Sequence, residues 1–261
     1  MLLVVVVSCN RQVQPIAAVP AANCGPAPVV SAAPLNSTQL QAEELESPVS
    51  QASLHFGAPE LGAHVTVADP RSYRVQIVTD AVGADIIGLD VALDEGRPRR
   101  VSVSAPTIAL GQLLSEDAEL TPGGHWLFAA PLVASGRVPR SALGGVRAAT
   151  ARRFFIGDTP DEAAGPSGAV WLRKPEGTYN GAKGNEAVLF DAFTFSALGA
   201  PIDTPCTITL RSASVSGQLR LASPFALHEV PSGLYDVSAS ASTARPSATH
   251  FIVNRELSGG P

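Results

Sequence analysis

Histidines are the side chains of this 261-residue chain best suited to hold a metal ion or to move a proton. No two of them have the HxxxH or HExxH spacing that places two imidazoles on one face of a helix to bind zinc. His125 follows a pair of glycines at the start of an apolar segment, where packing at a strand edge is the expected role. The pattern predicts no metal site at any histidine: His55, His64, His125, His228 and His250.

The serines, acids and glycines also lack the spacing that catalysis or phosphate binding requires. No serine lies in a GxSxG turn that exposes a nucleophile, and no glycine-rich segment continues into the Lys-Ser/Thr of a phosphate loop. Four aspartates are regularly placed but do not match the DxDxDG calcium loop: Asp80, Asp85, Asp90 and Asp94. We therefore expect no catalytic residue, no metal and no cofactor, and hence no enzyme.

Charge is scarce and evenly spread. Charged residues make up 16% of the chain, and the net charge is −5. The one basic cluster, Arg97, Arg99 and Arg100, is interrupted by Pro98 and is interpreted as a solvated strand end. Because the chain has no basic stripe, we expect no nucleic-acid partner.

The N-terminus carries a cysteine in a distinctive setting. An apolar run, residues 2–7, is followed by Ser8 and Cys9, and Val6-Val7-Ser8-Cys9 resembles the lipobox of a bacterial lipoprotein. The resemblance implies that residues 1–8 are a signal-peptide remnant and that Cys9 carries a lipid. The chain would then be anchored in the bacterial envelope, at the outer membrane, facing the periplasm or the surface. The run departs from the pattern in being short and in lacking a preceding Lys or Arg, so an accidental match is the alternative.

The segment after Cys9 is rich in proline and alanine. Residues 10–60 contain seven prolines, which interrupt any helix or sheet interior. We expect residues 9–60 to form a disordered, extended tether. Only residues 38–46 (TQLQAEELE) have the composition of a short helix.

Alternating apolar and polar residues begin past Leu61. Residues 73–78 and 87–94 alternate with a period of two, and residues 206–211 repeat this pattern in the second half. That period is the signature of a strand with one face in a core. We therefore predict an all-β protein with two domains. Their limits are 61–158 and 166–257.

A short motif occurs once in each half. Residues 122–128 (PGGHWLF) align without a gap with residues 231–237 (PSGLYDV). In each, proline presets a turn, glycine permits positive φ, and an aromatic residue opens a strand. We take this as a tandem duplication, which predicts positive φ at Gly124 and Gly233. It also predicts that Trp126 and Tyr235 point the same way on equivalent strands.

This arrangement resembles the tandem immunoglobulin-like or fibronectin-like domains of bacterial surface proteins, over about residues 61–257. The resemblance implies two β-sandwich domains and a structural or adhesive role.

Two cysteines remain once Cys9 is assigned to the lipid. In an oxidising periplasm Cys24 and Cys206 could form a disulfide that closes the tether onto the second domain. The alternative is that they are independent, Cys24 in the tether and Cys206 in a strand.

Three functions compete. The first is a non-catalytic envelope lipoprotein with a structural, adhesive or protein-binding role, whose partner is a protein or a glycan. The second is a carbohydrate-binding lipoprotein, which needs exposed aromatic side chains. The third is a hydrolase with an unrecognised site, which needs an open cleft with convergent acids. The exposure of Trp126 and Trp171 separates the first two, since sugar platforms require solvent-facing rings.

Overall fold

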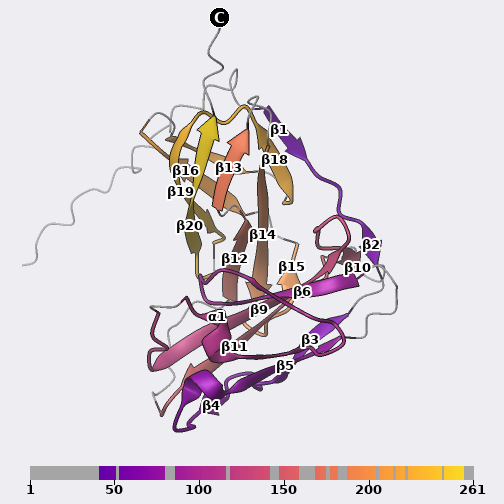
Figure 1. Ribbon diagram of the computed structural model, residues 1–261, viewed down its shortest axis with the longest axis vertical. Helices are drawn as coiled ribbons and strands as arrows, with labels where there is room; N and C mark the ends of the chain where they lie inside the picture. Colours follow the sequence, from indigo (N-terminus) through magenta and orange to yellow (C-terminus); the bar gives the residue numbers. More distant parts are fainter. Residues whose placement is uncertain are drawn as a thin grey trace, which may run out of the picture. The chain divides into compact units, whose positions relative to one another are not determined.

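A computed structural model describes most of the chain from Gln41 to Arg255. The described residues are 41–50, 53–79, 86–115, 118–141, 147–158, 168–174, 177–181, 187–203, 206–213, 216–220, 223–242 and 244–255. Strands dominate them (Figure 1), and the helical elements there are η1 (Pro70–Ser72) and α1 (Leu110–Leu113). The all-β prediction is confirmed. Among the helices of these residues, none is long and apolar enough to cross a membrane.

The first half forms sandwich 1, made of two sheets. One sheet has the order β3-β5-β8 and the other β4-β11-β9-β6-β7. The bounds are β3 (Leu54–Ala58), β4 (His64–Val65), β5 (Arg74–Thr79), β6 (Ile86–Leu93), β7 (Arg99–Val101), β8 (Thr107–Ala109), β9 (Gly123–Val133) and β11 (Thr150–Ile156).

The second half forms sandwich 2. One sheet has the order β12-β14-β18-β1, with β15 also on β14, and the other β13-β20-β19-β16-β17. The bounds are β1 (Gln41–Glu44), β12 (Gly168–Lys174), β13 (Gly177–Gly181), β14 (Val188–Ser196), β15 (Pro201–Ile202), β16 (Thr207–Arg211), β17 (Ser216–Arg220), β18 (Phe225–His228), β19 (Gly233–Ser240) and β20 (Ser247–Arg255).

The two sandwiches share one topology. Reading β3 as strand A, sandwich 1 runs A-A′-B-C-C′-E-F-G through β3, β4, β5, β6, β7, β8, β9 and β11, and sandwich 2 repeats the series from β12. In both, A′ pairs parallel with G while G, F, C and C′ pair antiparallel. A sheet with strands A, B and E facing one with C, F and G is the immunoglobulin arrangement. The predicted tandem immunoglobulin-like fold is confirmed.

Each sandwich has its own core between its sheets. The core of sandwich 1 includes Val75, Leu89 and Phe154, and that of sandwich 2 includes Phe190, Tyr235 and Phe251. These are the inward positions of alternating strands, which is why the period of two was legible in the sequence. The link between the sandwiches lies between Ile156, where β11 ends, and Gly168, where β12 begins.

A third core joins the sandwiches. It is formed by residues on the outer faces of their sheets: Ala92, Trp126, Phe128, Ala130, Leu132, Val138, Ala149, Ala151, Ala169, Trp171, Phe193 and Phe195. Its rings form a continuous ladder, with Phe128 stacked on Trp171 at 5.5 Å and Trp171 on Phe193 at 5.5 Å. Strand β9 is apolar on both faces because one faces the core of sandwich 1 and the other this junction.

Buried ion pairs cross the same junction. Arg173 of sandwich 2 donates from Nη2 to Asp90 of sandwich 1 at 2.8 Å and from Nη1 to Asp191 at 2.6 Å. Asp191 in turn accepts from Arg147 of sandwich 1. All four side chains are nearly inaccessible to water, with at most 11% of any side chain exposed. Two arginines and two aspartates thus balance their charges inside the junction.

The predicted start of the folded part near Leu61 is wrong for the described residues 41–58. Strand β1 pairs with β18 of sandwich 2, and β3 belongs to sandwich 1, where Phe56 is 3% exposed. Residues 41–44 are therefore a strand and not the start of a short helix, because the edge of β18 offers them backbone partners. The predicted signal remnant and the rest of the tether, up to residue 40, lie outside the described residues.

The shared turn is real, but its predicted register is off by one residue. Positive φ occurs at Gly123, with φ of 126°, and not at Gly124. Gly123 and Gly233 each open the F strand, opposite Ile156 and Val253 of the G strands. His125 and not Trp126 is thus the counterpart of Tyr235. Since side chains alternate along a strand, Trp126 points away from its own core, while Tyr235 lies within one.

Trp126→Ala should disrupt the junction rather than only sandwich 1. Truncating a buried Trp costs about 3–5 kcal/mol, and this side chain is 3% exposed in the third core. We expect wild type to unfold in one calorimetric transition and the variant in two at lower temperature.

The repeat supplies a matched control for this experiment. Asp236 occupies the position of Trp126 in sandwich 2 and is exposed, so Asp236→Ala should change stability by about 0.5 kcal/mol or less. A Trp126→Ala protein that keeps a single transition at the wild-type temperature would contradict the junction's role.

Candidate partner-binding groove

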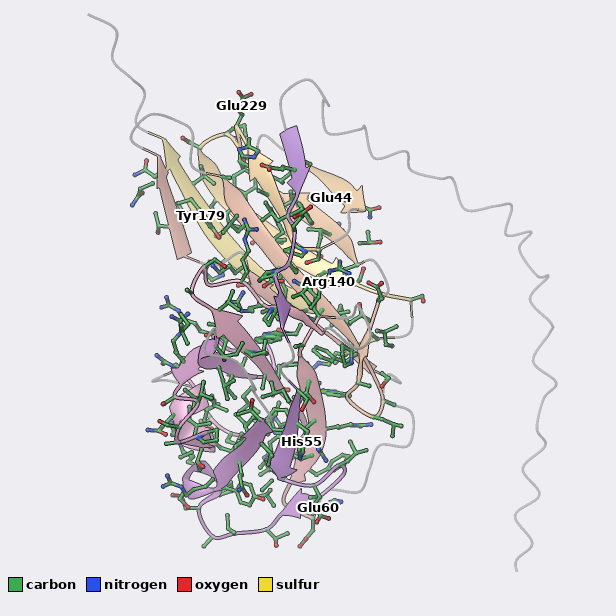
Figure 2. All side chains as sticks on the ribbon, turned by 90° about the vertical axis from the view of Figure 1, so that its right-hand side faces the viewer. Glu44, His55, Glu60, Arg140, Tyr179 and Glu229 are labelled. Carbon is green, nitrogen blue, oxygen red and sulfur yellow. The ribbon has the colours of Figure 1, made fainter. Side chains whose placement is uncertain are left out.

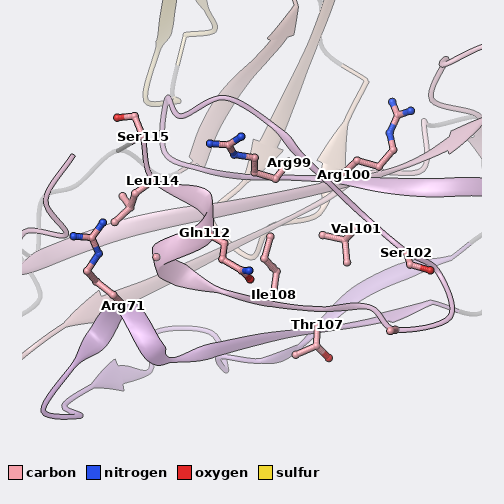
Figure 3. Close-up of a pocket in the computed structure, with 12 residues that line it drawn as sticks. Arg71, Arg99, Arg100, Val101, Ser102, Thr107, Ile108, Gln112, Leu114 and Ser115 are labelled. Carbon is pink, nitrogen blue, oxygen red and sulfur yellow. The ribbon is translucent and has the colours of Figure 1, made fainter. Parts of the chain in front are cut away.

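A hollow of about 770 Å³ opens between the edge strands β7 and β8 of sandwich 1. Figure 3 shows Arg71 beside α1, and Arg99 and Arg100 on the strand that runs across the opening from Thr107. We call it the arginine groove and define it by six of its lining residues: Arg71, Arg99, Arg100, Val101, Ile108 and Gln112.

Local sequence places these side chains. A turn at Asp94–Gly96 sends the chain back along β6, with Asp94 at a φ of 51° that aspartate tolerates better than most residues. Alternation along β7 then puts Val101 into the core, while Arg100 lies on the opposite face, where its Nε is 3.5 Å from Asp90. On the other wall, Asp69 caps the single turn of η1 by accepting from the Arg71 N–H.

The groove is positively charged and has an apolar floor. Val101 and Ile108 are buried, at 6% and 7% exposure, whereas Arg71, Arg99 and Arg100 are exposed. Among the described residues, no ion pair engages Arg71 or Arg99. Arg100 pairs with one carboxylate oxygen of Asp90, whose other oxygen is bound by Arg173. Exposed guanidinium groups around an apolar floor favour a ligand with several carboxylates and some apolar surface.

The sequence singled out two of these arginines but assigned them no binding role. The cluster at residues 97–100 was interpreted as a solvated strand end, and Arg99 and Arg100 do stand exposed on an edge strand. Arg71 was not singled out, because only the pairing of β5 with β8 and the packing of η1 on α1 bring it to the groove. No local pattern around Arg71 announces that proximity.

The tryptophans do not form a sugar platform. Trp126 is 3% exposed and Trp171 is 1% exposed, and both lie in the third core. Tyr235 is also buried. No aromatic side chain is among the described residues that line the arginine groove.

The histidines are dispersed, as their spacing indicated. His64 stacks on Phe155 at 5.0 Å, and His228 lies 3.1 Å from the carboxylate of Glu43. His55 and His250 lie on β3 and β20. Within the described ranges no group of three His, Cys, Asp or Glu side chains could hold a metal ion.

His125 has an unusual environment that its sequence context did not reveal. Its Nδ1 lies 2.7 Å from the Asp94 carboxylate and its Nε2 2.7 Å from the Thr121 carbonyl. Both partners can only accept, so both ring nitrogens must donate, which requires the imidazolium form. Burial lowers the pKa of His125, but the Asp94 hydrogen bond and charge and the Thr121 carbonyl outweigh burial and the repulsion from Arg245, and the pKa is raised above 6.5.

At the equivalent position at the start of strand F, sandwich 2 has Tyr235 in place of His125. The Tyr235 hydroxyl donates to the Pro231 carbonyl at 2.9 Å, four residues upstream, as His125 does to Thr121. A tyrosine at the start of strand F bonded back to the upstream backbone is the tyrosine corner of immunoglobulin domains. In sandwich 1 the corner is therefore ionised, and in sandwich 2 it is neutral.

Only one of the three cysteines lies in the described part of the chain. Cys206 is a free thiol, 3% exposed, with its Sγ 3.2 Å from the Thr194 hydroxyl. Burial raises its pKa, so the thiol is unreactive at neutral pH. Cys9 and Cys24 lie outside the described residues, and the pairing of Cys24 with Cys206 stays a prediction.

Comparisons with known proteins add little to this geometry. No protein-family model and no curated protein matches the chain. Among solved structures, the fibronectin(III)-like modules of Clostridium thermocellum CbhA cover 80% of this chain and 97% of their own at 11% identity, with a TM-score of 0.27. The Ig1-2 module of the Drosophila receptor protein tyrosine phosphatase DLAR covers 77% and 99% at 13% identity, with a TM-score of 0.25. With scores this low, the fold assignment rests on the strand order itself.

The ionised corner predicts a pH dependence for sandwich 1. The folded-state pKa of His125 is raised above its unfolded value of about 6.5. Its stabilisation is therefore complete below about pH 6.5 and is lost as pH rises through the folded-state pKa. Between about pH 6 and about pH 9, the free energy of unfolding in urea should fall in wild type. It should fall less in His125→Tyr, which copies the corner of sandwich 2. Equal slopes would contradict the ionised form.

Proposed function

We propose that this chain is a non-catalytic, lipid-anchored envelope protein that binds an acidic segment of a partner protein in the arginine groove. The observation that carries the proposal is the pair of exposed guanidinium groups of Arg71 and Arg99 at an open hollow with an apolar floor. Arginine recognises carboxylates through planar, paired hydrogen bonds, which suits glutamate or aspartate side chains.

A protein ligand is favoured over a sugar by what lines the groove. Carbohydrate sites stack sugar rings on exposed aromatic side chains, and both tryptophans are committed to the third core. The buried Val101 and Ile108 instead offer apolar contact of the kind that peptide side chains make. The carbohydrate-binding alternative therefore loses the feature on which it depended.

The anchoring half of the proposal rests on the N-terminal sequence. Cys9 follows an apolar run and a small residue, as in bacterial lipoproteins, and residues 10–40 separate it from the first described strand. With such a tether, the two sandwiches would stand off the outer membrane of a bacterial envelope, facing the periplasm or the surface.

A fluorescent oligo-glutamate peptide tests the groove. Charge-assisted hydrogen bonds contribute about 1.5–3 kcal/mol each, so Arg71→Glu combined with Arg99→Glu should weaken binding by at least about tenfold in fluorescence anisotropy. Raising the salt concentration should weaken the wild-type complex, because exposed charges are screened.

Arg74→Glu combined with Arg211→Glu is the matched control. It makes the same charge change at two exposed side chains, on β5 and β16, outside the groove lining, and should leave the affinity near that of wild type. Equal losses in both variants would reduce the effect to net charge. Binding of an oligogalacturonate but not of the peptide would replace the protein partner by an acidic glycan.

Cys9→Ser tests the anchor. One acyl chain binds a membrane only marginally, and stable anchoring needs two, at about 0.8 kcal/mol per buried CH₂. In a bacterial host the wild type should incorporate labelled fatty acid and sediment with membranes, whereas the variant should do neither. An unlabelled wild type whose Cys9→Ser form stays in the membrane pellet would refute lipidation.

A further inference from the structure

Strand β1 completes a sandwich to which its neighbours in sequence do not belong. Residues 41–44 precede sandwich 1, yet they pair antiparallel with β18 of sandwich 2, with Gln41 opposite His228 and Glu44 opposite Phe225. Figure 1 shows β1 beside β18, away from β3, which follows it in the chain. The strand is thus brought in from far away in sequence and is joined to the rest through a single connection.

The edge that β1 covers requires a cover. Strand β18 reads Phe-Ala-Leu-His, and its first three residues are at most 2% exposed. It contains no proline or lysine, the residues that usually protect a sheet edge. Without β1, an apolar strand would present unpaired N–H and C=O groups to any extended segment.

The cover itself is held lightly. Ala42, Glu43 and Glu44 are all exposed, so these side chains add nothing to the core. Their one described ion pair joins Glu43 to His228, with side chains 62% and 36% exposed, and such surface pairs contribute little. Backbone hydrogen bonds therefore supply most of the attachment of β1.

The segment after β1 is fastened to both sandwiches. Leu45 N–H donates to the Pro224 carbonyl of sandwich 2 at 2.8 Å, and the Glu46 carbonyl accepts from Arg137 of sandwich 1 at 2.9 Å. Pro48, two residues after Glu46, accepts at its carbonyl from the Arg140 N–H at 2.7 Å. Figure 2 labels Glu44 and Arg140. Beyond that point β2 (Val49–Ser50) pairs with β10 (Arg140–Ser141). For β1 to turn away within residues 45–48, the Leu45–Pro224 and Glu46–Arg137 hydrogen bonds must be released, while the Pro48–Arg140 bond and the β2–β10 pairing keep the remainder docked.

We propose that β1 is exchanged between two copies of this chain, the β1 of each pairing with the β18 of the other. The occupant is a second copy because β1 is the segment whose fit to this edge is seen, and another molecule supplies an identical strand. Every backbone bond and the Glu43–His228 pair are then remade. One donor and one acceptor per copy give a closed, two-fold dimer.

The protein concentration decides whether β1 pairs with the β18 of its own chain or with that of a second copy. Once the bonds of residues 45 and 46 are released, β1 is held by a short connection and competes with an effective concentration of about 1 mM. Exchanged dimers should therefore form near that protein concentration, or when the chain is refolded there.

Mixed disulfide trapping detects the exchange. Two full-length variants, both with Cys9→Ser and Cys24→Ser, are refolded together at about 1 mM. One carries Gln41→Cys and the other His228→Cys, which are register partners. Mild oxidation joins them efficiently when β1 of one molecule lies on β18 of the other. We expect a covalent heterodimer on a non-reducing gel, well in excess of either homodimer.

The register supplies the control. Glu44→Cys pairs with Phe225 and lies three residues away from the His228 partner. Because a disulfide needs Cα atoms within about 7 Å, it should give at least about tenfold less heterodimer with His228→Cys. Equal yields would mean random collision, and absence of the heterodimer at this concentration would mean that β1 serves only its own chain. Either result overturns the proposal.

Discussion

The arrangement of the molecule depends on four charged side chains that are almost entirely shielded from water. Asp90 and Arg147 belong to sandwich 1, and Arg173 and Asp191 to sandwich 2. The Asp90–Arg173 and Arg147–Asp191 pairs cross the junction, and the Arg173–Asp191 pair lies within sandwich 2. Burial opposes the ionisation of Asp191 and Arg173, but the two arginines lower the pKa of Asp191, and the two aspartates raise that of Arg173. Removing one partner from such a set leaves a buried charge without compensation, at about 3–5 kcal/mol. Asp90 and Arg147 of sandwich 1 pair with Arg173 and Asp191 across the junction, so separating the sandwiches would break both of these pairs.

The aromatic ladder around those charges explains why one repeat makes a junction and the other does not. At equivalent outward positions of strand F, sandwich 1 has Trp126 and Phe128 where sandwich 2 has Asp236 and Ser238. The first face is covered by β12 and β14, and the second ends the stack with a polar surface. Gly199 allows the close approach: its carbonyl accepts from the Ala151 N–H at 2.9 Å, and a Cβ there would lie 1.8 Å from the Ala151 oxygen.

The sequence predicted what depends on local pattern. The period of two in residues 87–94 and 206–211 revealed strands C of both repeats, and the turn glycines revealed the duplication. The one-residue error at that turn followed from matching Trp126 to Tyr235 by aromatic type, when the structural counterpart, His125, shares only the hydrogen bond to the backbone four residues upstream. The convergence of Arg71 with Arg99, and of Asp90 with Arg173, depends on which faces pack together. A single sequence contains no local signal for that choice, although the apolar residues on both faces of β9 indicate that both are buried.

The conformation of strand β1 is set by a sheet edge that is distant in sequence, that of β18. Residues 38–46 have helix-forming composition, yet Gln41–Glu44 is extended because β18 offers a row of backbone partners that a helix of this length could not match. The same segment crosses from sandwich 2 to sandwich 1 through Leu45, Glu46 and Pro48. This segment therefore stabilises the junction at its surface, in addition to the ion pairs buried inside it. A force applied at the N-terminus would act on β1 before it acted on either core. Strand β1 would therefore detach first, and its loss would expose the apolar edge of β18.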